Sequence, residues 1–156
     1  MGRYRGILKH PFFLEYLEEI AGLEKDRIYC GHSLEHLLAV ARIAYINVLE
    51  EKLPYDRDIV YAAALLHDIG RTVQYKRGIP HEVAGVDPAM QILKSCGYTE
   101  AEISDITEAI SRHRDRHGDS LSAVLYKADK RSRNCYVCKA ADTCNWPEDK
   151  RNSGII

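Results

Sequence analysis

The chain has 156 residues, 46% of them hydrophobic and 29% charged, which fits one soluble globular domain with a real core. Its net charge of −1 and isoelectric point of about 6.6 give no sign of a nucleic-acid or anionic-membrane partner. No apolar run approaches the roughly 20 residues of a membrane span, and no signal-peptide pattern opens the chain. We therefore expect a cytoplasmic protein whose five cysteines are reduced thiols or metal ligands.

The spacing of apolar residues is helical along most of the chain, and no alternating β pattern is sustained. We therefore expect an all-α fold, a single-domain helical bundle. Start and stop signals set the boundaries: Pro11 as a first helical residue, Asp56 as a cap, and Thr99 with Glu102 as a capping box. The predicted helices cover residues 11–21, 33–51, 56–69, 87–97, 99–110 and 121–131.

The third predicted helix is apolar on every face over Ile59–Leu66, which indicates a place in the middle of the fold, and Gly70 is its expected stop. Residues 71–85 resemble a linker, because Gly78 and Pro80 interrupt them. The next helix is expected to begin at Asp87, although a longer helix from about residue 81, kinked at proline 88, is the competing interpretation.

His67 and Asp68 stand side by side at the end of the most buried predicted helix. An imidazole and a carboxylate are costly to bury without a partner, and a divalent cation suits both. A helix cap and an arginine ion pair are the plain alternatives, and the dipeptide alone does not decide. His36 and Asp129 tip the balance, because each lies at the edge of a core-facing helix surface.

These residues give the chain a resemblance to the HD-domain superfamily of metal-dependent phosphohydrolases, over roughly residues 30–131. The resemblance implies a helical bundle that holds a divalent metal between helices, with Asp68 able to bridge to a second ion. Val40 matches the family's spacing and favours His36 over His32, which would replace it if His36 were exposed. The matching segments are His36 in HSLEHLLAV, His67 and Asp68 in LLHDIGR, and Asp129 in LYKADK.

The family resemblance also implies that members with two metals use histidines between the His-Asp pair and the final Asp. His81 and His113 are the candidates here, and the spacing of His113 after Ile106 and Ile110 turns it towards the core. A surface histidine and a satisfied core histidine are the plain alternatives. The sequence does not distinguish Mn, Mg, Co, Fe, Ni or Zn.

Basic side chains near this site are expected to bind phosphate oxygens while a metal-activated water attacks. Arg71, directly after the His-Asp pair, and Lys127, two residues before Asp129, are the best-placed candidates in the sequence. Arg112 and Arg114 flank His113 and are weaker candidates, since charge runs of this kind are usually solvated helix ends.

Three cysteines, Cys135, Cys138 and Cys144, follow the last predicted helix in a C-x2-C-x5-C arrangement. This spacing suits zinc or an iron–sulfur cluster, but three thiolates are incomplete without Cys30, Cys96, a histidine or an exogenous ligand. Free thiols in an irregular tail are slightly favoured.

The sequence thus divides into an N-terminal helix and lead-in (1–29), an HD-type core (30–133) and a cysteine-bearing tail (134–156). The favoured function is a phosphohydrolase for a small phosphate ester, a nucleotide above all, with Asp68, Arg71 and Lys127 as catalytic residues. A non-catalytic metal-stabilised binding domain and an HD-type di-iron oxygenase are the alternatives. No partner other than a small phosphorylated substrate is indicated, and the oligomeric state is left open.

Overall fold

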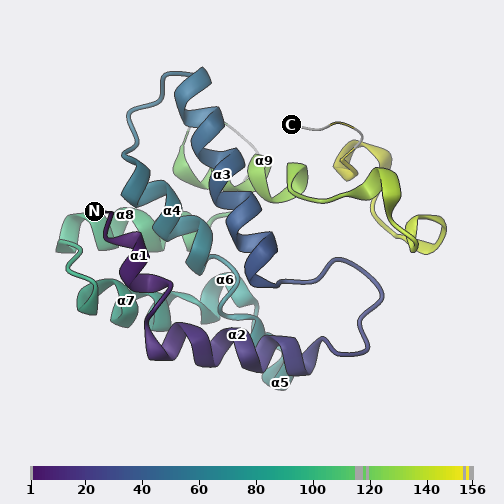
Figure 1. Ribbon diagram of the computed structural model, residues 1–156, viewed down its shortest axis with the longest axis horizontal. Helices are drawn as coiled ribbons and strands as arrows, with labels where there is room; N and C mark the ends of the chain where they lie inside the picture. Colours follow the sequence, from purple (N-terminus) through teal and green to yellow (C-terminus); the bar gives the residue numbers. More distant parts are fainter. Residues whose placement is uncertain (1, 115–117, 119, 153, 155–156) are drawn as a thin grey trace.

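The computed structural model describes residues 2–114, 118, 120–152 and 154, and these residues form helices with no strand. The expected all-α fold is confirmed, and Figure 1 shows the helices packed into one bundle. No described helix combines the length and apolar character required to cross a bilayer. The α-helices are α1 Tyr4–Ile7, α2 Pro11–Leu23, α3 Leu34–Glu50, α4 Arg57–Leu66, α5 Arg71–Arg77, α6 His81–Ala84, α7 Val86–Ser95, α8 Glu100–Ser111 and α9 Leu121–Arg131.

Helix α4 lies at the centre of the bundle, as its apolar sequence predicts. Every side chain from Ala62 to Leu66 is buried, and α4 packs against α1, α3, α8 and α9. Both α3 and α4 bury alanines, so their backbones can approach closely. This packing fixes the C-terminal end of α4, where His67 and Asp68 follow.

The helix starts agree with the capping signals in most cases. The side chains of Ser33, Asp56 and Ser120 accept hydrogen bonds from backbone N–H groups at the starts of α3, α4 and α9. Thr99 and Glu102 form the expected capping box at the start of α8.

Residues 71–85 are not a linker, contrary to expectation, because they form α5 and α6. Gly78, with φ of +72°, ends α5 in the left-handed conformation, and Pro80 occupies the position just before α6. Helix α7 begins at Val86, so Asp87 and Pro88 lie inside its first turn, where a missing N–H breaks no helical bond.

Gly70 does not stop α4 by adopting a left-handed conformation. Its φ is −69°, and α4 ends earlier, at Leu66. A Cβ atom on Gly70 would lie 2.1 Å from the His81 carbonyl oxygen and 2.6 Å from the Gly85 nitrogen. Glycine therefore allows α6 to lie directly against the turn that carries Asp68.

The tail after α9 contains three short 3-10 turns, Cys135–Val137, Ala141–Thr143 and Glu148–Lys150. It projects from the end of α9 on the same side of the molecule as the loop that joins α2 to α3 (Figure 1). No described residue from 134 to 152 is buried. The tail therefore adds almost nothing to the apolar core.

Candidate metal centre

His67 occupies the C-cap of α4 and is almost completely buried. Its Nδ1 lies 2.7 Å from the Ala64 carbonyl oxygen, which can only accept, so Nδ1 carries the proton. The other ring nitrogen, Nε2, makes no hydrogen bond in the described structure and lies 3.0 Å from the Asp68 Oδ2 atom. A ring lone pair beside a buried carboxylate is an arrangement that could hold a cation.

The first ligand group consists of His36, His67, Asp68 and Asp129, whose ligand atoms all lie within 4.8 Å of one another. His36 Nε2 lies 3.3 Å from Asp129 Oδ1 and 3.6 Å from Asp68 Oδ2. His36 Nδ1 lies 3.1 Å from the hydroxyl of Ser132, which itself donates to the Asp129 carbonyl at 2.7 Å. His36 therefore donates through Nδ1 and turns the lone pair of Nε2 towards both carboxylates.

The second ligand group consists of Asp68, His81 and His113, all of them buried. His113 Nδ1 donates to the Ile110 carbonyl at 2.6 Å, and His81 Nδ1 lies 2.9 Å from the Gln74 Oε1 atom. Their Nε2 atoms are 3.1 Å apart, and His81 Nε2 lies 3.3 Å from Asp68 Oδ1. Two ring lone pairs and a carboxylate oxygen at these distances fit a second cation.

The protonation states of the ligand residues suit a bound cation, because Asp68 is ionised and His81 is neutral. Burial opposes the charged form of Asp68, but His67 and His36 outweigh it and hold the pKa of Asp68 well below its usual range. Burial lowers the pKa of His81 to about 2, so this ring is neutral. Burial also disfavours protonated His67, but Asp68 and Asp129 outweigh it and raise its pKa. The first group thus attracts positive charge.

His32 lies beside the centre but outside the first group. Its Nε2 is 3.9 Å from Asp68 Oδ2, and its Nδ1 hydrogen-bonds to Glu24. The Tyr75 hydroxyl also donates to Glu24, at 2.6 Å. Burial works against the charged form of Glu24, but the hydrogen bonds from His32 and Tyr75 outweigh it and lower its pKa to about 2. His32 is thereby held by a carboxylate that the sequence did not single out.

Arg71 lies where the sequence predicts, with its Nε atom 3.0 Å from Asp68 Oδ1. Two further cations, missed at the sequence level, lie closer to Asp129. Lys130 Nζ is 2.6 Å from Asp129 Oδ2, and a terminal nitrogen of buried Arg133 is 3.0 Å from His36 Nε2 and 3.5 Å from Asp129 Oδ1. The sequence could have indicated both residues, because they follow Asp129 by one and four positions.

Lys127 does not lie at the centre, which corrects the sequence prediction. Its Nζ is 4.0 Å from Glu51, in a partly exposed pair outside the cavity beside the ligand groups. Arg112 is exposed and pairs with Glu108, one turn earlier in α8. Arg114 contributes to the cavity wall and lies 3.3 Å from Glu82.

A cavity of about 530 Å³ opens beside the two groups, with His32, His81, His113 and Asp129 in its wall. This volume suits a small organic ligand. Six described cationic side chains line it, against the single carboxylate of Asp129, and three aromatic side chains lie among them. The cations are Arg27, Arg71, Arg114, Lys130, Arg133 and Lys150, and the aromatic residues are Tyr29, Tyr126 and Trp146.

Comparison with known proteins places this architecture in a family. The HD domain model matches residues 33–145. An uncharacterized protein of Clostridium beijerinckii is 42% identical over 155 residues, which cover 99% of each chain. The crystal structure of a predicted HD superfamily hydrolase from an uncultured Thermotogales bacterium aligns with a TM-score of 0.64 and 25% identity, covering 90% of this chain and 82% of that one.

Ribonuclease Y of Clostridium kluyveri is 30% identical over 123 residues, and that of Clostridium tetani is 28% identical over 120. Each match covers 76% of this chain but 21% of the ribonuclease, so the similarity concerns one part of a much longer protein. The residues that the family model matches include every member of both ligand groups. The resemblance drawn from the His, His-Asp and Asp positions is therefore confirmed, and this chain belongs to the HD domain family.

Proposed function

We propose that this protein is a phosphohydrolase that cleaves a small phosphate ester, and that its two ligand groups, which share Asp68, would hold a pair of divalent cations. The observation that carries the proposal is the orientation of this one carboxylate. Oδ2 faces His36 and His67, whereas Oδ1 faces His81. A carboxylate shared between two ligand groups suits the paired-metal sites that act on phosphate esters.

Cations in these groups would supply hydroxide at neutral pH and draw negative charge from a phosphoryl group under attack. The chain itself binds and orients the ester. Arg71, Lys130 and Arg133 have N–H donors beside Asp68 and Asp129, at the edge of the cavity. Phosphate oxygens that enter the cavity can take these donors, and the guanidinium groups can bind two oxygens at once.

A nucleotide is the favoured substrate class because both cationic and aromatic side chains line the cavity. Tyr29, Tyr126 and Trp146 line it together with the basic residues. Lys130 Nζ lies 4.6 Å from the centre of the Trp146 ring, so a positive charge and a flat aromatic surface are adjacent. A phosphate beside the lysine would place an attached base within reach of these rings.

Oxidation by a pair of irons is the second candidate, and the histidine content of the ligand groups favours it. Four histidines and two aspartates form them, and imidazole binds iron well. The excess of cations in the cavity argues for a phosphate substrate instead. A third possibility, a binding domain without catalysis, predicts metal uptake without turnover.

The test is a turnover screen of the purified full chain with Mn²⁺, Mg²⁺ or Co²⁺ against nucleoside monophosphates, cyclic nucleotides and a short RNA. The RNA is included because the ribonuclease Y relatives are named for that substrate. We expect release of phosphate or cleavage of a diester that falls to background in Asp68→Asn. A metal-loaded protein inert towards every ester would contradict hydrolysis, and dioxygen uptake with iron would favour oxidation.

Arg133→Ala and Lys127→Ala form a matched pair that tests the cavity as the substrate site. Both remove a cation from the same end of the chain, but only Arg133 lies at the centre. We expect turnover to fall by about 10²-fold in Arg133→Ala, the usual effect of losing one donor to a developing oxyanion, and to change less than twofold in Lys127→Ala. Equal effects of the two substitutions would contradict the assignment.

A further inference from the structure

Four of the five cysteines gather at the junction of the tail and the loop before α3. Cys30, from that loop, lines one small cavity together with Cys135, Cys138 and Cys144. All four thiols are free and only partly buried. Cys30 therefore supplies the fourth thiol that the C-x2-C-x5-C arrangement of the tail lacks.

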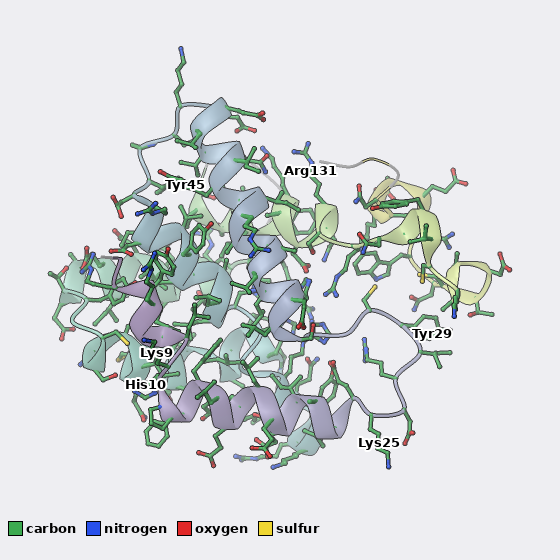
Figure 2. All side chains as sticks on the ribbon, in the orientation of Figure 1. Lys9, His10, Lys25, Tyr29, Tyr45 and Arg131 are labelled. Atoms are coloured by element: carbon green, nitrogen blue, oxygen red, sulfur yellow. The ribbon has the colours of Figure 1, made fainter. Side chains whose placement is uncertain are left out.

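One hydrogen bond joins the two cysteine-bearing segments, and others order each segment internally. The Tyr29 hydroxyl donates to the Thr143 carbonyl at 3.1 Å, and Figure 2 shows Tyr29 beside the tail. Arg151 donates to the carbonyls of Cys144 and Trp146, at 2.7 and 2.8 Å. On the loop side, Arg27 donates to the Cys30 carbonyl at 2.7 Å.

The tail cannot be ordered by apolar burial. No described residue from 134 to 152 is buried, and Tyr136 and Val137 are 58% and 70% exposed. Its regular structure is limited to three 3-10 turns of three residues each. Ordering so many residues costs about 1–2 kcal/mol each in backbone entropy, so a segment without a core needs another cross-link. In proteins, that cross-link is usually a disulfide or a metal.

We propose that Cys30, Cys135, Cys138 and Cys144 bind a metal centre through four thiolates, and that this centre fastens the tail to the loop before α3. It shares no ligand with the His and Asp centre, and Cys30 and Cys144 also line the cavity beside that centre. Cys96 takes no part, because it lies at the C-terminus of α7, against Gly6 of α1.

Two forms of this centre fit four thiolates. A single zinc ion with Zn–S bonds of about 2.3 Å needs sulfurs roughly 4 Å apart, whereas the thiolates of an iron–sulfur cluster are more widely spaced. Among the described residues, only the His and Asp groups have ligand atoms that all lie within 4.8 Å. The four sulfurs do not form such a group, so a single zinc ion would require their side chains to move closer together, into the cavity of about 30 Å³ that they line. Analysis of bound metal and sulfide distinguishes the two.

The experiment measures zinc, iron and acid-labile sulfide in the full chain, expressed and purified without oxygen. The variants are Cys30→Ser, the matched cysteine control Cys96→Ser, and Asp68→Asn, which removes the bridging ligand of the other centre. We expect stoichiometric zinc, or iron with equal sulfide, in the native chain, Cys96→Ser and Asp68→Asn, and its loss in Cys30→Ser. Absence of both from the native chain would overturn the proposal, and full retention in Cys30→Ser would overturn the role of Cys30.

Thiol titration keeps the proposal testable if Cys30→Ser fails to fold. In the native chain, treatment with a strong chelator should increase the number of thiols that react with a chromogenic reagent by four. Cys138→Ser should reproduce the metal loss of Cys30→Ser while its circular dichroism stays helical. Full thiol reactivity before chelation, or thiols that become reactive only after a reductant and thus come from disulfides, would overturn the proposal.

Discussion

Each ligand histidine has its Nδ1 committed to a neighbouring oxygen. His67 and His113 donate to backbone carbonyls three residues earlier, whereas His36 and His81 bond to the side chains of Ser132 and Gln74. The Nε2 lone pairs are therefore aimed at the carboxylates before any ion arrives. Such fixed orientation is typical of metal-binding histidines, since it sets both the tautomer and the ring direction.

Gly70 should be among the least replaceable residues that do not bind a ligand. In Gly70→Ala, the new methyl group would collide with the His81 carbonyl at 2.1 Å, so α6 would have to move away from Asp68. We expect a loss of about 3 kcal/mol in the free energy of unfolding, measured by urea denaturation. The matched control is Gly22→Ala in α2, where nothing lies within 4 Å and a gain of about 0.5 kcal/mol is expected. Equal stability of the two variants would contradict the close contact.

Sequence reasoning identified the ligand residue types, but it placed the basic residues less well. Lys127 precedes Asp129 by two positions, which on an α-helix turns it to the opposite face, and it indeed pairs with Glu51. Arg133 follows Asp129 by one helical turn and lies on its side. Helical geometry alone could therefore have favoured Arg133. The tie between His32 and Glu24 could not be predicted, because it depends on how the loop before α3 folds back on α2.

Helices with strong caps were predicted well, and short helices were not. The 121–131 prediction coincides with α9, and the capping box places α8 correctly. Helices α1 and α5, of four and seven residues, were missed because they have little periodicity to detect, and α6 was covered only by the alternative of a longer helix from about residue 81. In the sequence Gly78 and Pro80 suggest a loop, but in the structure they mark the end of one helix and the start of the next.

The ion pair between Arg3 and Glu102 joins the start of the chain to α8. It makes the stability of the fold depend on pH in the acidic range. Both Glu102 carboxylate oxygens accept from Arg3 at 2.7 Å. Hydrogen bonds from Arg3, followed by that from Thr99, lower the pKa of Glu102 from 4.5 to about 2. Because the folded pKa lies below the unfolded one, the stabilisation is present above about pH 4.5 and is lost as the pH falls towards 2.

Glu102→Gln tests this link while it keeps a residue that suits the capping box. We expect the variant to be less stable than the native chain by about 1 kcal/mol at pH 7, since solvent screens this partly exposed pair. The difference should shrink as the pH falls from 4.5 towards 2. Exposed Glu100→Gln in the same turn is the control. A difference that stays constant down to pH 2.5 would show that Glu102 acts through something other than its charge.

The folded chain brings together ligand residues that lie far apart in the sequence. The two ligand groups draw on α3, α6, α9 and the segments that follow α4 and α8, and only the packing around α4 makes them adjacent. The helical spacing of apolar residues predicted the bundle, and the family resemblance predicted the His and Asp centre. It could not predict the approach of Cys30 to the tail, because the contact joins two irregular segments.

Arg133 lies between the two proposed centres. It donates to the Gly31 carbonyl, next to Cys30, and its other terminal nitrogen faces His36 and Asp129. The Arg133 side chain therefore couples the conformation of the cysteine-bearing loop to the position of a positive charge in the cavity. This link explains why a residue just beyond the last α-helix is buried.

Titration of the chelator-treated chain with Mn²⁺, followed by calorimetry, tests the central claim most directly, because manganese prefers the imidazole and carboxylate groups to thiolates. We predict two bound ions per native chain, one in the His81→Ala/His113→Ala double variant, and neither bound tightly in Asp68→Asn. Saturation at 100 times the dissociation constant should stabilise the native chain by about 2.7 kcal/mol per site. A native chain that binds no manganese, or an Asp68→Asn variant that binds it equally well, would contradict the account.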